Sequence, residues 1–329
     1  MEYIKIKGTD IEVSTVGLGT WAIGGWMWGG TEEKTSIDTI HAAIDKGITL
    51  IDTAPAYGFG TSEKIIGKAV REAPVARDKV VLATKVALEW KDEKVFRNAS
   101  TDRIKKEVED SLQRLQTDYI DLYQVHWPDP KTSIEETATT LQQLKKEGKI
   151  RAIGVSNFDT QQMDEFRKYA DLNSLQPPYN LFEREIEKDL LPYCEENDIT
   201  TLLYSSLCRG LLTGKMKPDS QWEGDDLRNV DPKFQEPRYD QYLYAVQQLD
   251  DYARTHHGKR VIHLAIRWIL QQPAANIPLW GARKPQQVDA LGELFGWELS
   301  TEDLKNIDQI LNDTIKDPVG PEFMAPPKE

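Results

Sequence analysis

Short apolar runs rich in β-branched residues alternate with amphipathic helical patterns along almost the whole chain. After an N-terminal hairpin there are eight such runs, at residues 14–21, 48–54, 78–86, 118–126, 149–157, 173–180, 199–207 and 275–282. Several are almost continuously apolar, which is typical of parallel strands that are covered on both faces. Eight strand–helix units favour closure into a barrel over an open sheet. We therefore predict an α/β fold, a single (β/α)8 TIM barrel that spans residues 1–329.

Three segments lie outside the repeating units. Residues 3–14 alternate apolar and polar side chains around a Gly-Thr-Asp turn, which predicts a β-hairpin. Residues 217–241 are polar, rich in Asp and Pro, and without clear periodicity, so we expect an insertion or lid near the functional site. Residues 301–313 predict an extra C-terminal helix, and the proline-rich tail from residue 317 onward shows no helical pattern.

Local signals also predict how individual helices begin and bend. Thr61 or Ser62 is placed to cap the helix after the second strand, and Ser133 the helix after the fourth. Pro192 is expected to break or kink the helix after the sixth strand, because proline cannot donate a backbone hydrogen bond.

Composition and charge exclude several classes of function. The formal net charge is -13 and no basic tract stands out, which argues against a nucleic-acid partner. The two cysteines, Cys194 and Cys208, form no metal-binding or disulfide pattern, so we expect no metal. The N-terminus lacks the apolar core of a signal peptide, and no apolar run approaches the roughly 18 residues of a membrane span. We expect a cytoplasmic protein that is a monomer or a weak homo-oligomer.

Polar residues stand where the predicted strands end, which is where TIM barrels carry their active sites. Asp52 ends the second strand and Tyr57 follows it in the loop; Lys85 ends the third strand, and His126 the fourth. Further polar or small residues close the later strands: Ser156, Asn157, Gln176, Tyr204, Ser205, Gly281, Ala282 and Arg283. Taken singly, Asp52 could cap a turn, Lys85 could be solvated, His126 could be a buried structural histidine and Tyr57 could pack. Together, four titratable residues from three adjacent strands predict a catalytic site.

These four residue types could protonate a carbonyl oxygen. A tyrosine has an ordinary pKa of about 10, and we expect the Lys85 ammonium to lower the pKa of Tyr57. Asp52 would keep Lys85 charged and in place, and His126 could donate a hydrogen bond to the substrate oxygen. Such a set suits carbonyl reduction, in which hydride reaches carbon while the phenol protonates oxygen.

At this point the sequence resembles the aldo-keto reductase superfamily over nearly its whole length. The segment GITLIDTAPAYG…SEKIIGKAV is similar to the first family signature, and Asp52, Tyr57, Lys85 and His126 fall on its catalytic tetrad in order. The segments IGVSNF, LQPPYN, YSSLCRGLLTGK and GARKPQQV resemble its cofactor-binding segments. The segment LWGARKP at the last predicted strand and the tail segment DPVGPEFMAPP are similar to those of bacterial enzymes of the general-stress-protein type, a subgroup that uses NADPH.

The resemblance implies NADPH or NADP+ as cofactor and assigns roles along it. Tyr204 would stack on the nicotinamide, Ser156, Asn157 and Gln176 would hold its carboxamide, and Thr20, Trp21 and Asp52 would lie beside it. The pyrophosphate would follow Ser205, Ser206, Leu207, Cys208, Arg209 and Gly210, with Lys215. Trp280, Gly281, Ala282, Arg283 and Gln287 would reach the adenosine end. Independently of the resemblance, Arg283 is a candidate for a 2′-phosphate, because a guanidinium can pair bidentately with phosphate.

At two positions of the expected cofactor site the sequence differs from the usual family pattern, and one further motif is misleading. Ser206 stands where the family often has proline, and Trp280 precedes Gly281 where Ile-Pro-Gly is common. The segment GLGTWA at 17–22 fits the loose dinucleotide-binding pattern, but no helix follows it, as that fingerprint requires.

Tryptophans are concentrated in predicted loops above the strand ends. Trp21, Trp26, Trp28, Trp90 and Trp127 all lie there, and from them we expect an aromatic pocket wall made by Trp21, Trp28, Trp90 and Trp127. Such a wall would suit a small-molecule carbonyl or alcohol substrate.

The leading interpretation is an NADPH-dependent aldehyde reductase or alcohol dehydrogenase. An alternative is a regulatory NADPH-binding protein similar to potassium-channel β subunits, which share this fold, although the bacterial-type motifs argue against it. A third is a (β/α)8 isomerase or hydrolase that binds a phosphorylated substrate at Arg283.

Overall fold

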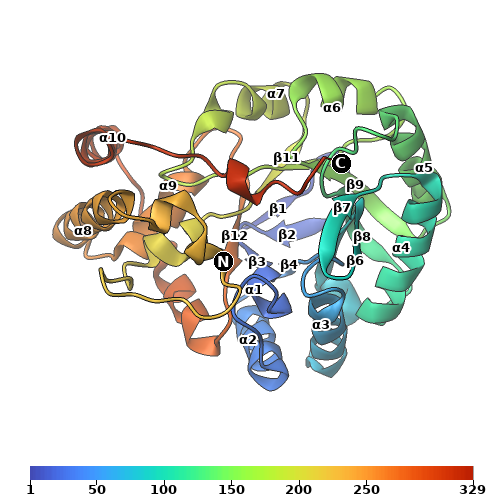
Figure 1. Cartoon of the computed structure of the whole chain (residues 1–329), viewed down its shortest axis with the longest axis horizontal. Coiled ribbons are helices and arrows are strands. Elements are labelled where there is room, and N and C mark those ends of the chain that lie inside the picture. The colour runs from blue at the N-terminus through green and yellow to red at the C-terminus, as the bar shows by residue number, and fades with distance from the viewer. Residues whose placement is uncertain (329) are drawn as a thin grey trace.

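Eight parallel strands close into one barrel in the spatial order β10-β11-β12-β3-β4-β5-β8-β9, as the computed structural model of residues 1–328 shows (Figure 1). The predicted (β/α)8 barrel is therefore confirmed. The barrel strands are β3 (Gly17–Gly19), β4 (Leu50–Asp52), β5 (Val81–Val86), β8 (Ile120–Val125), β9 (Ile150–Ser156), β10 (Ser174–Gln176), β11 (Thr200–Leu203) and β12 (Ile277–Gly281).

Helices surround the barrel and cover its outer face (Figure 1). They are α2 (Glu33–Asp45), α3 (Thr61–Glu72), α4 (Thr101–Leu115), α5 (Ile134–Lys146), α6 (Thr160–Phe166), α7 (Leu190–Glu196), α8 (Arg238–His257) and α9 (Val261–Leu270). The short helix α1 (Trp21–Gly24) lies in the loop after β3, and α10 (Thr301–Thr314) packs against α8. Helix α5 begins as predicted, because Ser133 Oγ accepts a 3.1 Å hydrogen bond from the backbone nitrogen of Glu136. No helix within residues 1–328 is long and apolar enough to cross a membrane.

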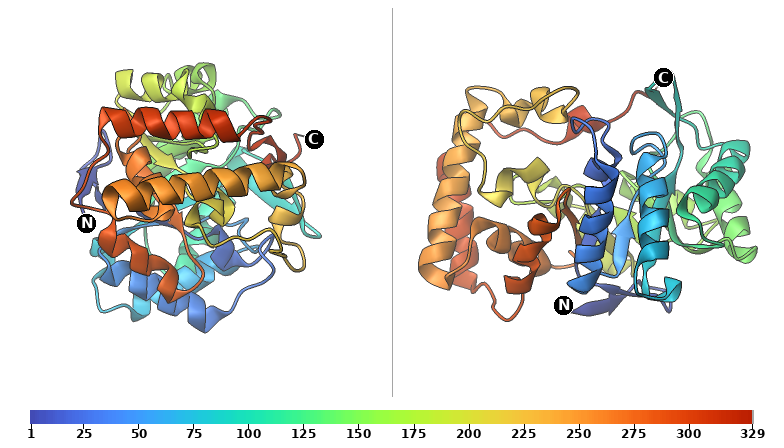
Figure 2. Two further views of the ribbon diagram at one scale, coloured as in Figure 1. Left: turned by 90° about the vertical axis from the view of Figure 1, so that its left-hand side faces the viewer. Right: turned by 90° about the horizontal axis from the view of Figure 1, so that it is seen from below.

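An N-terminal hairpin closes one end of the barrel. Strands β1 (Tyr3–Lys5) and β2 (Glu12–Ser14) pair antiparallel, and Ile6, Ile11 and Val13 pack on apolar side chains inside the barrel. The right-hand view of Figure 2 shows this hairpin opposite the end where the chain's C-terminus lies. A functional site inside the barrel mouth can therefore open only at the other end, where the barrel strands finish.

Two predicted helix boundaries are wrong. Helix α3 has Gly60 as its N-terminal cap, with φ of 91°, instead of Thr61 or Ser62. Glycine suits this position because its φ lies in the left-handed region, which residues with a Cβ atom rarely adopt. The helix predicted around Pro192 is interrupted before that residue, between a 3₁₀ turn at Glu185–Glu187 and α7. Pro192 lies in the first turn of α7, where the missing N–H costs little.

Connections above the barrel hold structure that the sequence patterns did not reveal. A second hairpin, β6 (Leu88–Lys91) and β7 (Lys94–Arg97), follows β5. The polar segment expected at 217–241 contains two 3₁₀ turns, Leu227–Asn229 and Pro232–Phe234, before α8 begins. A 3₁₀ helix, Pro285–Glu293, follows β12.

Candidate active site

The structure brings Asp52, Tyr57, Lys85 and His126 together at one end of the barrel. Lys85 Nζ lies 2.7 Å from Asp52 Oδ2 and 3.4 Å from Tyr57 Oη, and it also donates to the Thr53 carbonyl oxygen at 2.8 Å. The rings of Tyr57 and His126 meet edge to face, with centroids 5.7 Å apart. Lys85 is fully buried and Asp52 nearly so, so the ion pair belongs to the barrel interior.

Close backbone packing holds the turn that carries Tyr57. The backbone nitrogen of Tyr57 donates to the carbonyl oxygen of Ala54 at 3.1 Å, and that of Gly60 to Pro55 at 2.7 Å. Gly58 has φ of 65°, and a Cβ atom there would overlap the carbonyl oxygen of Gly24 at the end of α1. Only glycine allows this approach, which fixes the tyrosine turn against the loop that follows β3.

Burial decides the protonation states of the site. Burial, together with the Asp52 carboxylate, raises the pKa of Tyr57 well above its ordinary value. Burial lowers the pKa of Lys85, an effect that the Asp52 charge opposes. Burial and the Lys85 charge hold the pKa of His126 well below its ordinary value. The expected lowering of the Tyr57 pKa is therefore wrong for this structure: the phenol keeps its proton, and the imidazole is neutral.

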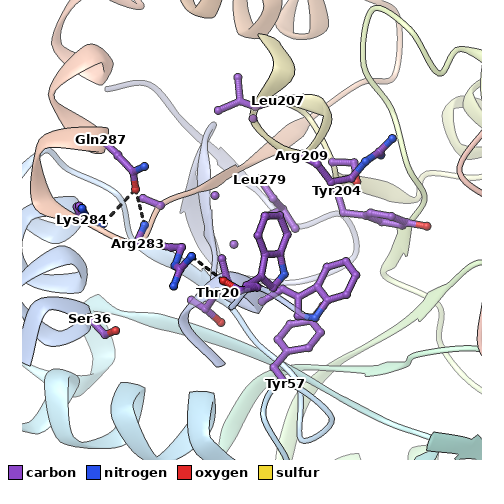
Figure 3. Close-up of a pocket in the computed structure, with 18 of the residues that line it drawn as sticks. Thr20, Ser36, Tyr57, Tyr204, Leu207, Arg209, Leu279, Arg283, Lys284 and Gln287 are labelled. Carbon is purple, nitrogen blue, oxygen red and sulfur yellow. Dashed lines mark hydrogen bonds between the residues drawn. The ribbon is translucent and has the colours of Figure 1, made fainter. Parts of the chain in front are cut away.

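An elongated cavity of about 530 Å³ extends from Tyr57 and Tyr204 to Arg283 and Gln287 (Figure 3). Most of the expected cofactor residues line it, namely Thr20, Trp21, Asp52, Tyr204, Ser205, Ser206, Leu207, Arg209, Gly210, Gly281, Ala282, Arg283 and Gln287. A second cavity of about 650 Å³ adjoins its far end and is lined by Lys215 and Trp280, among others. The two cavities share Arg228 and Gly210 in their walls, so they are adjacent.

Four expected cofactor residues, Ser156, Asn157, Gln176 and Cys208, line neither cavity. Gln176 Nε2 donates to Asp52 Oδ1 at 2.8 Å, and Ser156 Oγ donates to the Gln176 carbonyl oxygen at 2.7 Å. Asn157 Oδ1 accepts a 2.9 Å hydrogen bond from Tyr204 Oη. These three side chains therefore support the residues that do line the cavity.

The fourth, Cys208, lies in the protein interior. Its side chain is fully buried. Burial raises the pKa of its thiol to about 12, so the sulfur is an uncharged packing group.

Arg209 is committed to a buried cluster of four charges and presents no free guanidinium to a phosphate. It donates to Glu183 Oε1 at 2.7 Å and to Asp231 Oδ2 at 2.7 Å. Lys233 Nζ lies 2.8 Å from the same Glu183 oxygen. Burial would raise the pKa of Glu183, but Arg209 and Lys233 outweigh it and lower that pKa to about 2. The side chain therefore anchors the loop, while the residue still lines the cavity, and its expected place along the pyrophosphate stays a prediction.

Arg283 lies at the far end of the cavity, where it contacts the loop after β3. Its guanidinium donates to the Trp28 carbonyl oxygen at 2.7 Å and also to the carbonyl oxygen of Gly30. Figure 3 shows Gln287 turned toward Arg283 and Lys284, whose backbone nitrogens donate to its Oε1 at 2.6 and 3.0 Å. From the opposite side of the same loop, Asp225 Oδ2 accepts from the Met27 nitrogen at 2.6 Å.

Two of the four expected pocket tryptophans lie at the cavity. Trp21 stacks on Tyr57 with centroids 5.9 Å apart and meets Trp28 edge to face at 5.7 Å. Trp90 and Trp127 line neither cavity. Trp90 packs on Phe59 at 5.7 Å, and Trp127 lies under the guanidinium of Arg97. Both belong to the surrounding loops.

Sequence reasoning missed two residues of this region. Gln124 Nε2 donates to Asp52 Oδ1 at 3.2 Å, and a polar residue within the apolar run of β8, two positions before His126, was the signal. Arg228 lines both cavities from the insertion, where no periodic pattern marks a residue's direction. Within residues 1–328, no cluster of three or more His, Cys, Asp or Glu side chains is arranged to hold a metal ion.

Comparisons with known proteins agree with this geometry. The model of the Aldo/keto reductase family matches residues 15–312. The aldo-keto reductase YhdN of Bacillus subtilis is 67% identical over 327 residues, covering 99% of this chain and 98% of that protein. The NADH-specific methylglyoxal reductase of Escherichia coli is 40% identical over 303 residues, covering 88% and 91%.

Solved structures of other proteins also superpose on nearly the whole chain. A glycerol dehydrogenase from Gluconobacter oxydans superposes with a TM-score of 0.89 at 53% identity, covering 98% of this chain and 99% of that one. An aldo-keto reductase from Klebsiella pneumoniae in complex with NADPH superposes with a TM-score of 0.74 at 28% identity, covering 94% and 95%.

Proposed function

The chain belongs to the aldo/keto reductase family of oxidoreductases, and from that premise we propose that it reduces aldehydes or ketones to alcohols with NADPH. The reverse reaction would oxidise alcohols or polyols with NADP+. The observation that carries the proposal is the Tyr57 phenol, 3.4 Å from Lys85 Nζ, at the end of a cavity that extends to Arg283. A proton donor at one end of an elongated recess suits a large cofactor with a small substrate beside it.

The residues at the barrel end would supply the proton and hold the substrate oxygen. Tyr57, kept protonated by burial and by Asp52, would donate its phenolic proton to the carbonyl oxygen. His126, neutral because its pKa is depressed, would donate an N–H to the same oxygen. Lys85 lies close enough to Tyr57 to stabilise the phenolate that remains after proton transfer. Bound in the cavity, NADPH would supply the hydride to the carbonyl carbon.

The residues along the cavity fit a phosphorylated dinucleotide. Arg283 and Lys284 bring two cationic side chains to its far end, which suits an anionic adenosine phosphate. Arg228 lies beside them, with its guanidinium paired to Asp226. Gly281 leaves open space, since a Cβ atom there would meet no atom within 4 Å. The relatives differ in cofactor, because one is described as NADH-specific and another was solved with NADPH. The cationic side chains of Arg283 and Lys284 lead us to propose NADPH for this chain.

Turnover with defined carbonyls tests the proposal. We would follow the nicotinamide absorbance of NADPH and NADH with a panel of aldehydes and ketones that includes methylglyoxal, and the reverse reaction with glycerol and NADP+. The expected result is carbonyl-dependent oxidation that is faster with NADPH than with NADH at low cofactor concentration. Binding of NADPH without turnover of any carbonyl or alcohol would contradict a reductase and favour a regulatory protein. Failure to bind either nucleotide would overturn the cofactor assignment.

A further inference from the structure

Gln124 lies inside the barrel next to the catalytic ion pair. It is on β8, opposite Lys85 on β5 and opposite Gly154 on β9 in the strand register. Its side chain is fully buried. A buried amide is costly unless its polar atoms are hydrogen-bonded, so its partners show what it is for.

The partners of Gln124 are Asp52 and Gln176. Asp52 Oδ2 accepts from Lys85 at 2.7 Å, whereas Oδ1 accepts from Gln176 at 2.8 Å and from Gln124 at 3.2 Å. Gln176 Nε2 also donates to Gln124 Oε1 at 3.3 Å. Both carboxylate oxygens are thus held, one by the ammonium and the other by two amides.

The neighbouring strand leaves room for this amide. A Cβ atom at Gly154 would lie 2.9 Å from Cγ of Gln124 and would overlap Oγ of Ser174. Gly154 has an ordinary strand conformation, so the space, not the backbone angle, calls for glycine. The missing side chain at Gly154 on β9 therefore leaves space for the Gln124 side chain on the neighbouring strand β8.

We infer that Gln124 is a positioning residue, which with Gln176 fixes the Asp52 carboxylate so that its other oxygen holds Lys85 beside Tyr57. The inference rests on the proposed carbonyl reduction for its kinetic consequence. Gln124 touches neither cavity, so its effect on the reaction passes through Asp52. Hydrogen bonds to a buried anion are among the stronger ones in proteins, and they hold the anion in one orientation.

Two substitutions separate this role from simple packing. Gln124→Glu keeps the shape of the side chain but places a carboxylate against Asp52, whereas Gln124→Leu loses the hydrogen bond without adding charge. If Gln124 positions Asp52, the isosteric Glu is the more harmful change. If Gln124 only fills space, the Leu variant keeps the kcat of the unmodified protein, because most of the side-chain volume is retained. Exposed Gln113 on α4, changed to Leu and to Glu, is the matched control.

The experiment measures kcat, the Kd for NADPH and the thermal midpoint of each variant, in the wild-type and Asp52→Asn backgrounds. We expect kcat to fall about tenfold in Gln124→Leu and at least about a further tenfold in Gln124→Glu, with the Kd for NADPH changed by less than about twofold. The excess loss of thermal stability in the Glu variant should vanish with Asp52→Asn, because the opposing carboxylate is then gone.

A Leu variant with the kcat of the unmodified protein overturns the inference, and so does an excess destabilisation of the Glu variant that persists with Asp52→Asn. If the unmodified protein reduces no carbonyl, the proposed function fails. The stability comparison across the two backgrounds then still decides whether Gln124 holds Asp52.

Discussion

Arg283 donates a 2.7 Å hydrogen bond to the carbonyl oxygen of Trp28, so the loop after the last barrel strand is tied to the loop after the first. Trp28 in turn packs against Trp21, which stacks on Tyr57. A residue at the proposed adenosine end of the cavity is therefore linked by contacts to the proposed proton donor.

Replacement of Arg283 by alanine tests which of its two roles dominates. We expect Arg283→Ala to weaken NADPH binding by about ten- to a hundredfold and NADH binding much less, because only NADPH carries the 2′-phosphate. Fluorescence titration with both nucleotides measures this, with Arg254→Ala on the exposed face of α8 as control. Equal losses for the two nucleotides would show that Arg283 acts only by holding the Trp28 loop.

Removal of the Tyr57 hydroxyl should separate binding from chemistry. We expect Tyr57→Phe to keep NADPH affinity while kcat for carbonyl reduction falls by about a hundred- to ten-thousandfold, because only the proton donor is lost. Exposed Tyr244→Phe should leave both values unchanged. Near-normal kcat in the Tyr57 variant would mean that another group protonates the substrate.

The pH dependence of reduction follows from the direction of two pKa shifts. The pKa of His126 is depressed by burial and Lys85, and that of Tyr57 is raised by burial and Asp52. The reactive state, neutral His126 with protonated Tyr57, therefore persists below the ordinary histidine value of about 6.5 and above the ordinary tyrosine value of about 10. We expect single-turnover reduction to vary by less than about twofold from about pH 6 to about pH 9. A loss of rate centred near the ordinary histidine pKa would contradict the depressed value.

The buried charge cluster around Arg209 makes a prediction about stability. In Glu183→Gln, Arg209 and Lys233 lose their shared anion, so we expect the free energy of unfolding to fall by about 3–5 kcal/mol. Glu185→Gln, nearby in the chain but exposed, should change it little. Urea denaturation at neutral pH measures both variants.

The same cluster should make the free energy of unfolding decrease when the pH is lowered. The pKa of Glu183 is about 2 in the folded protein, below its unfolded value of about 4.3, so its stabilisation is complete above the unfolded value. That contribution is lost as the pH falls from about 4.3 toward 2, and Glu183→Gln should remove this part of the acid sensitivity. An identical slope in the two proteins over that range would contradict the assignment.

Strand ends were predictable because the pattern that identifies a barrel also fixes where its strands finish. Asp52, Lys85 and His126 follow apolar runs, so the sequence alone predicts that their side chains meet at one end of the barrel. The sequence also places Tyr57 in the loop after the second strand. The exact position of its side chain depends on the close packing of Gly58 against the backbone of Gly24, and a contact between distant parts of the chain leaves no local sequence pattern.

Other parts of the site could not be read from local sequence. The ion pairs of Arg209 with Glu183 and Asp231 join three loops, so their partners have no fixed spacing along the chain. The direction of the Tyr57 pKa shift could not be predicted from the sequence either, because it too depends on tertiary packing. A neighbouring lysine is visible in the sequence, whereas the extent of burial that outweighs it depends on the packed structure.

The four buried charges of Glu183, Arg209, Asp231 and Lys233 also constrain how this chain can diverge. Two cations and two anions share one interior site, so a change of sign at any one position leaves an uncompensated charge until a second position changes too. Substitutions at these positions should therefore be inherited in pairs. The attachment of this loop to the barrel through Asp231 and Lys233 therefore constrains residues that lie outside the cavity.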